Sequence, residues 1–191
     1  MKLNLKWSLI LVALLVVFSL TTGAIHSSLE EKIAENAFDT DDDLDIANLL
    51  PDASSLKKIE DIEFSEEDPV KEVHEAYDGD ELKGYLIKTD AEGAYSTISI
   101  ATAIDIEGNI SGIEILAQKE TEGLGDDIVE DEFTDRFRNK TTAEPLTLVK
   151  EETSADDEIQ GITGATISAQ AVVTGVNDAV EFYNSQLKER D

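Results

Sequence analysis

The chain has 191 residues, and 43 acidic against 15 basic residues give it a formal net charge of −28. Lys2 and Lys6 precede a long apolar run, so everything after that run carries 13 basic and 43 acidic residues, a net charge of −30. Nucleic acid and anionic lipid are poor partners for such a surface. The absence of cysteine excludes disulfides, thiolate-held iron–sulfur clusters and haem attached through cysteine. A redox function therefore needs a cofactor that is held in another way.

The first element is the apolar run from Trp7 to Ile25, which contains no charge and has about the length that crosses a bilayer as a helix. Because both lysines precede it and acidic residues follow, the positive-inside rule predicts a cytoplasmic N-terminus and an exported domain. We expect residues 1–26 to be a single-pass anchor in the cell membrane. A signal peptide cleaved near Thr22-Gly23-Ala24 is the alternative, and it also makes the domain extracytoplasmic.

Residues 27–66 are acidic, and Ser27 or Ser28 can cap a short helix at their start. We interpret this segment as part helix and part solvated linker, with the linker running to about Ser65.

Alternating aspartates from Asp39 to Asp45 are similar to a calcium-binding loop. Leu44, however, stands where that loop needs its glycine, and Leu50 stands where it needs its final glutamate. We therefore expect no metal site.

Between Val70 and Ala117 the apolar residues recur with period two, which is typical of strands. Val73 to Tyr77 and Leu82 to Lys88 flank the turn Asp78-Gly79-Asp80 and predict a hairpin. Two more strands are predicted on either side of a second turn at Glu107-Gly108-Asn109. Their expected core positions are Ile98, Ile100, Thr102, Ile104, Ile106, Ile110, Ile113 and Ile115. The pattern indicates an antiparallel meander with one buried face.

The second half reads as helices packed on this sheet. A helix capped near Asp126 is expected to direct four apolar side chains to the core, and a strand is expected from Leu146 to Val149, followed by an acidic loop. A long last helix begins near Thr166. The core residues expected from the two helices are Ile128, Val129, Phe133, Phe137, Val172, Val176, Ala179, Val180, Tyr183 and Leu187. We predict an α+β fold for residues 67–191, an antiparallel β-meander packed with helices and preceded by one transmembrane helix.

The stretch Gly161-Ile162-Thr163-Gly164-Ala165-Thr166-Ile167-Ser168 is a small-residue turn that opens the last helix. Unpaired backbone N–H groups and the positive end of the helix dipole make such a turn a natural site for phosphate. Gly164 and Ala165 leave room for a ligand to approach the backbone. The alternative is that Thr163, Thr166 or Ser168 simply caps the helix.

The sequence gives little support for a metal site, a catalytic triad or a nucleotide-binding motif. His26 and His74 are the only histidines, and neither has neighbours that suggest a metal site or a catalytic triad. The chain has no phosphate-binding P-loop and no dinucleotide glycine fingerprint. A second loop has the sequence Glu120-Thr121-Glu122-Gly123-Leu124-Gly125. By itself, such a glycine-containing loop is more often a simple turn than a ligand-binding loop. Only together do the two loops point to a ligand.

As a pair, these loops resemble the FMN-binding domain of the RnfG and NqrC subunits of membrane redox pumps. That family carries Glu-Thr-Pro-Gly-Leu-Gly, matched by Glu120–Gly125, and Asp-x-x-Ser/Thr-Gly-Ala-Thr, matched by Gln160–Thr166. The length is nearer to that of RnfG. Glu122 replaces the proline and Gln160 replaces the aspartate, although Glu158 lies close by in the sequence.

The resemblance implies that a flavin transferase esterifies the Thr166 hydroxyl to the phosphate of FMN. It further implies FMN contacts from Glu120, Thr121, Gly123, Leu124, Gly125, Thr163, Gly164, Ala165 and Ile167. The protein would position the flavin, which does the chemistry. No residue is expected to be catalytic or to bind metal.

The function that this family resemblance implies is an electron relay, on the extracytoplasmic side, in an ion-translocating ferredoxin:NAD⁺ oxidoreductase. The isolated chain would turn over no substrate, and its partners would be the other subunits of the complex, the flavin transferase and the membrane, with no nucleic acid. One alternative is an FMN-carrying protein of another respiratory or extracellular electron-transfer chain. The other is a cofactor-free acidic binding module tethered to the membrane.

Overall fold

The structure is a computed structural model in which residues 46–151, 153 and 155–188 are described. They belong to one compact unit, Asp45–Asp191. The predicted anchor at Trp7–Ile25, the helix after Ser27 and the aspartates before Ile46 lie outside the described residues. Within the described residues, no helix combines the length and the apolar character needed to span a membrane.

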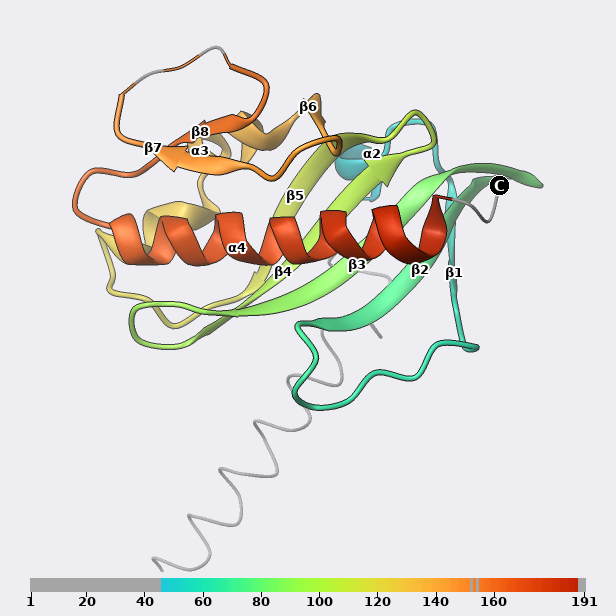
Figure 1. Ribbon diagram of the computed structural model, residues 1–191, viewed down its shortest axis with the longest axis horizontal. Coiled ribbons are helices and arrows are strands. Elements are labelled where there is room, and N and C mark those ends of the chain that lie inside the picture. The colour runs from blue at the N-terminus through green and yellow to red at the C-terminus, as the bar shows by residue number, and fades with distance from the viewer. Residues whose placement is uncertain (1–45, 152, 154, 189–191) are drawn as a thin grey trace, which may run out of the picture. The chain divides into compact units, whose positions relative to one another are not determined.

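Six antiparallel strands form the main sheet, and their order in space follows their order in the chain (Figure 1). They are β1 (Ser55–Lys58), β2 (Val70–Asp78), β3 (Glu81–Glu92), β4 (Thr97–Asp105), β5 (Asn109–Ala117) and β6 (Lys140–Thr141). The predicted meander is confirmed. The predicted hairpin is also present, because Asp78 pairs with Glu81 across a two-residue turn whose Gly79 has a φ of 62°, a value that favours glycine.

A β-bulge in β5 explains the irregular spacing of two isoleucines. Ala103 pairs with Gly112 but Ile104 pairs with Ile110, so Ser111 is an extra residue on β5. The bulge returns Ile113 to the face occupied by Ile110, and both side chains are buried. The expectation for Ile106 was wrong. It follows the last residue of β4 and is 48% exposed, because the alternation stops where the strand ends.

The predicted last helix is confirmed as α4 (Thr166–Phe182), continued by the π-helical turn η3 (Tyr183–Leu187). Figure 1 shows α4 lying across one face of the sheet, and all six expected apolar residues of α4 and η3 are buried. The approach is close at Gly175. A Cβ atom there would lie 2.6 Å from Ile100 Cδ1, and the Gly175 carbonyl accepts a 3.0 Å hydrogen bond from the Thr89 hydroxyl.

A second, two-stranded sheet packs beside the start of α4. The expected strand appears as β7 (Thr147–Val149), and it pairs in parallel with β8 (Glu158–Gln160), which lies in the stretch expected to be an acidic loop. Asn177 of α4 fastens this sheet. Its side chain donates to the Leu146 carbonyl at 2.9 Å and accepts from the Leu146 N–H at 2.8 Å.

The single helix expected after Asp126 is wrong, because three short turns replace it: η1 (Gly125–Val129), α3 (Asp131–Thr134) and η2 (Asp135–Phe137). Glu130 has extended backbone angles, φ −71° and ψ 141°, which interrupt the helix. Ile128, Phe133 and Phe137 are buried as expected, whereas Val129 is 44% exposed. Asp126 does not cap a helix. Its carboxylate accepts from the Leu124 N–H at 3.1 Å.

Residues from Ile46 to Lys58 do not form the solvated linker that we expected. They contain α2 (Ile46–Leu49) and the edge strand β1. Leu49, Leu50 and Ala53 of this region are buried, and so is Ile59 directly after it. Their burial outweighs the acidic character that suggested a linker. The folded unit therefore starts well before residue 67.

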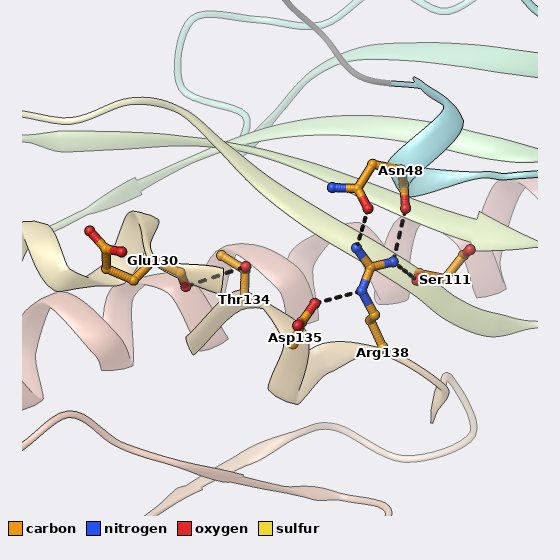
Figure 2. A network of polar contacts seen from close by, with 6 residues as sticks. All are labelled: Asn48, Ser111, Glu130, Thr134, Asp135 and Arg138. Atoms are coloured by element: carbon orange, nitrogen blue, oxygen red, sulfur yellow. Dashed lines mark hydrogen bonds and ion pairs between the residues drawn. The ribbon is translucent and has the colours of Figure 1, made fainter. Parts of the chain in front are cut away.

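Arg138 holds α2 against the sheet (Figure 2). Its guanidinium donates to the Asn48 carbonyl at 2.9 Å, to the Asn48 side-chain oxygen at 2.9 Å and to the Ser111 carbonyl at 3.1 Å. It also pairs with Asp135 of η2 at 2.7 Å. One side chain thereby joins α2, the bulge of β5 and η2.

Candidate functional site

Thr166 is the first residue of α4, as the sequence predicted, and it is exposed. Ala165 occupies the N-cap position, and no side chain caps the helix there. The alternative that one of the three nearby hydroxyls caps the helix is therefore wrong. A 17-residue helix leaves its first N–H groups without helical partners and carries partial positive charge at this end.

The two glycine loops lie against each other, although they are about 40 residues apart in the sequence. Gly164 has a φ of 89°, and a Cβ atom on it would lie 2.8 Å from Leu124 Cδ1. A Cβ atom on Gly125 would lie 3.0 Å from the Ser168 hydroxyl oxygen. At both positions the backbone of one loop lies against a side chain of the other loop or of the first turn of α4.

All the site residues expected from the sequence belong to these two contacting loops, but they are not equally accessible. The exposed ones are Thr121, Gly123, Leu124, Thr163, Gly164, Thr166 and Ile167, and the buried ones are Glu120, Gly125 and Ala165. Contacts with FMN from this set are a proposal.

The Glu120 carboxylate is buried, with 9% of the residue exposed. Its Oε1 accepts from the backbone N–H groups of Tyr95 and Ser96, both at 3.1 Å, and from the Ser96 hydroxyl at 3.3 Å. Its Oε2 accepts from the Ala94 N–H at 3.1 Å and from the Ser168 hydroxyl at 2.6 Å. Figure 1 shows the β3–β4 turn, the loop after β5 and the start of α4 at one end of the sheet.

Two opposing effects set the pKa of Glu120. Burial alone would raise the pKa, because it disfavours the charged form. The hydrogen bonds from Ser168 and from the backbone of Tyr95, Ala94 and Ser96 together outweigh burial, and the pKa lies below its ordinary value. Glu120 is therefore a buried anion at neutral pH.

Thr166 lines two depressions in the surface, one on each side of the start of α4. One, of about 530 Å³, lies between α4 and β3 and is lined by Asp90, Glu92, Ile167 and Thr174, among others. The other, of about 340 Å³, is lined by Leu148, Val149, Lys150 and the turn 161–164. Both volumes fall in the range of small-ligand sites.

The two depressions differ in charge. The first has the carboxylates of Asp90, Glu92 and Asp178 in its wall, whereas Lys150 is the only charged residue among the described residues that line the second. A phosphate group at Thr166 is therefore favoured on the Lys150 side. Sequence reasoning missed Lys150. The available signal was a lysine directly after the predicted strand, in an otherwise acidic stretch.

Arg136 holds the segment that leads into the Thr166 turn. Its guanidinium donates to the carbonyls of Gln160 at 2.7 Å and Gly161 at 3.2 Å, and it pairs with Glu132 at 3.2 Å. Glu158, the acidic neighbour of Gln160, accepts a 2.6 Å hydrogen bond from the Thr153 hydroxyl. Sequence reasoning also missed Arg136, since nothing in the sequence pairs it with β8.

Large apolar side chains are exposed around the site. Leu124 is 42% exposed, Ile167 is 64% exposed, and Tyr95, in the β3–β4 turn beside Glu120, is 78% exposed. Single exposed apolar residues are common on protein surfaces, but these three lie on the segments that meet at Glu120 and Thr166. They offer apolar surface to a planar aromatic ligand next to Thr166, so the residues present fit FMN: a hydroxyl, a helix start, a cation and apolar contacts.

Comparison with known proteins agrees with this geometry. Residues 93–181 match the family model described as the FMN-binding domain. The RnfG protein of the Na⁺-translocating ferredoxin:NAD⁺ oxidoreductase complex of Acetobacterium woodii is 34% identical over 139 residues, covering 71% of this chain and 67% of that protein. The RnfG protein of the proton-translocating complex of Clostridium ljungdahlii is 32% identical, covering 62% and 63%.

Among solved structures, the NqrC protein of the Na⁺-translocating NADH-quinone reductase of Parabacteroides distasonis has a TM-score of 0.51 and 24% identity. The match covers 60% of this chain and 63% of that one, and it supports the fold alone. The match thus spans about two thirds of the length of these two RnfG proteins. The family match and the identity to RnfG proteins show that the chain belongs to the FMN-binding domain family of RnfG and NqrC.

Proposed function

We propose that this chain is the FMN-carrying subunit of an ion-translocating ferredoxin:NAD⁺ oxidoreductase, with FMN joined as a phosphoester to Thr166. It relays electrons on the extracytoplasmic side and has no substrate turnover of its own. The names of its relatives, all subunits of ion-translocating oxidoreductase complexes, support the complex, and the FMN-binding domain match supports the cofactor.

The observation that carries the proposal is the place of Thr166. It is an exposed hydroxyl residue at the first position of a 17-residue helix and lies between two depressions. The helix N-terminus favours the negative charge that a phosphodiester retains. Lys150 in the adjacent wall adds a positive charge.

FMN supplies the reversible uptake of electrons when it is bound. The chain's own residues bind the FMN phosphate, orient the flavin ring and shield it from water. Thr166 provides the attachment oxygen, Lys150 and the start of α4 favour the phosphate, and Leu124 and Ile167 offer apolar surface to the ring. Arg136 keeps the turn before Thr166 in place through the carbonyls of Gln160 and Gly161.

The membrane anchor is part of the proposal. Trp7–Ile25 holds the domain at the outer surface of the cell membrane, and Lys2 and Lys6 keep the N-terminus in the cytoplasm. Protease added to spheroplasts digests the domain and spares the N-terminus if this topology holds. A protected domain contradicts it, and a mature N-terminus near Ile25 supports the signal-peptide alternative.

Flavin attachment is tested by co-expression with a flavin transferase. We expect the wild type to give a fluorescent band on a denaturing gel and Thr166→Ala to give none. Thr163→Ala is the matched control, because Thr163 is also an exposed threonine of the same turn. A fluorescent Thr166→Ala together with a dark Thr163→Ala would show that Thr163, and not Thr166, carries the flavin.

The role of Gln160 is tested in the same assay. If the wild type stays dark and Gln160→Asp becomes fluorescent, the transferase needs the aspartate, and this chain is not a natural substrate for covalent attachment. If both stay dark and the purified protein binds no FMN, the cofactor-free binding module is the better account.

A further inference from the structure

We propose that Glu120 is a positioning residue of the flavin site: its buried carboxylate fixes the Thr166 turn against the Glu120–Gly125 loop and places a permanent negative charge beside the flavin. This inference rests on the proposed function. It assigns Glu120 a role different from the direct flavin contact that the family resemblance implies.

The carboxylate joins three segments that are distant in sequence. It accepts hydrogen bonds from Ala94, Tyr95 and Ser96 in the β3–β4 turn, and from Ser168 in the first turn of α4. Glu120 itself opens the glycine loop. Losing its acceptor oxygens would leave part-buried backbone N–H groups of the β3–β4 turn without these partners, which costs stability.

Two glycines near this carboxylate lie where a side chain would collide with Glu120. A Cβ atom on Gly93 would lie 2.5 Å from Glu120 Oε1. A Cβ atom on Gly125 would lie 2.9 Å from Glu120 Cβ and 3.0 Å from the Ser168 hydroxyl oxygen. Gly125 therefore makes room for the Glu120–Ser168 hydrogen bond, in addition to any room that it leaves for a ligand.

Ser168 links the Glu120 carboxylate to the helix turn that contains Thr166. The two residues lie in the same helical turn, so the 2.6 Å bond from the Ser168 hydroxyl to Glu120 fixes the position of the helix start. The contact of Leu124 with Gly164 closes the same loop against the other end of the turn. The backbone that carries the Thr166 side chain is thus held in place relative to the glycine loop.

The negative charge of Glu120 persists because its hydrogen bonds do not neutralise it. All five of them, within the part of the chain that the structure describes, come from uncharged donors, three backbone N–H groups and two hydroxyls. A buried charge is screened less by salt than an exposed one. Taking up electrons adds negative charge to the flavin, so a fixed anion nearby disfavours reduction and lowers the flavin midpoint potential.

Two variants separate the two effects. Glu120→Gln keeps the size of the side chain and removes its charge, and it replaces one acceptor oxygen by an amide N–H group, which cannot accept from the backbone N–H groups of the β3–β4 turn. Ser168→Ala keeps the charge and removes only the tie to α4. Glu122→Gln is the matched control, since it removes a charge from an exposed position of the same loop. Folding of each variant is checked by circular dichroism and thermal melting.

For Ser168→Ala and Glu120→Gln we expect flavin attachment to slow by up to about 100-fold, the loss that a misplaced reacting group produces. The attached flavin of Glu120→Gln should have a higher midpoint potential than that of the wild type. Ser168→Ala and Glu122→Gln should keep the wild-type potential, and Glu122→Gln should also keep the wild-type attachment rate.

The inference is overturned if folded Glu120→Gln takes up flavin at the wild-type rate with an unchanged potential. If Glu120→Gln does not fold, Ser168→Ala decides, and a wild-type attachment rate in that variant rejects the positioning role. A wild type without flavin, by contrast, rejects the proposed function itself.

Discussion

The side chain of Leu124 packs on the backbone of Gly164, so closely that a Cβ atom on the glycine would lie 2.8 Å from Leu124 Cδ1. This contact joins the loop that follows the meander to the turn that carries Thr166. The positive φ of 89° strains any residue other than glycine at this position, and an added Cβ atom would also displace the end of the Leu124 side chain.

Gly164→Ala should therefore destabilise the domain by about 1–3 kcal/mol, the cost of a non-glycine residue held in such a conformation, plus the cost of displacing Leu124. Urea unfolding measures the change. Gly123→Ala is the control, because Gly123 has a φ of 71° but no described atom within 4 Å of its would-be Cβ. Equal losses in both variants would show that the Leu124 contact adds nothing, whereas recovery in Gly164→Ala/Leu124→Ala would support it.

Arg138→Ala should loosen α2 from the sheet. The change removes the charged donors to Asn48 and Ser111 that Figure 2 shows, and bonds of this kind contribute about 1.5–3 kcal/mol each at most. We expect a total loss of roughly 2 kcal/mol in urea unfolding. Lys83→Ala removes an ion pair with the exposed Glu81, and the loss of this pair should cost less than about 1 kcal/mol. Equal losses of stability in the two variants would contradict the role of Arg138 in holding α2 against the sheet.

Asp178, on α4, is expected to lower the stability of the fold at neutral pH, because its pKa is raised. Burial, and then the nearby charge of Glu181, raise its pKa above the ordinary value. The folded state thus binds the proton more tightly than the unfolded state, and stability falls as pH rises from the ordinary pKa through the raised one. Asp178→Asn should melt at a higher temperature than the wild type at pH 7, with no difference below the ordinary pKa of aspartate. A lower melting temperature at pH 7 would contradict this sign.

Lys150→Gln should weaken the site for phosphate. Lys150 is the only charged residue among the described ones that line the second depression at Thr166, and an exposed charge pair of this kind contributes up to about 1 kcal/mol. In a Thr166→Ala background, which leaves FMN to bind without a covalent bond, we expect Kd for FMN to rise roughly fivefold. Titration of flavin fluorescence measures it, with Lys83→Gln as the control. An unchanged Kd would show that the FMN phosphate does not lie beside Lys150.

The sequence predicted the parts of the fold that carry strong periodicity. Alternating isoleucines identified β4 and β5, and spacing near 3.6 identified α4. It missed β1, whose sequence Ser-Leu-Lys-Lys is that of a short polar edge strand, and β8, whose three residues lie in an acidic stretch. Neither is long enough to show a period, and each forms because a partner strand lies beside it.

The sequence paired the two loops of the candidate site but did not predict the contacts within it. The two loops were recognised from their glycines and from family resemblance, and the structure brings them together. The Glu120–Ser168 hydrogen bond, the Arg136 contacts and the place of Lys150 all join residues distant in sequence. No local pattern encodes such pairs, so a sequence without its fold does not reveal them.

Mass spectrometry of the proteolytic peptide that contains Thr166 tests the central claim most directly. After expression with a flavin transferase, the peptide should be heavier by the mass of FMN less one water, and fragmentation should assign the added mass to Thr166. An unmodified Thr166 peptide from a protein that carries flavin on another residue, or from one that carries none, would contradict the account.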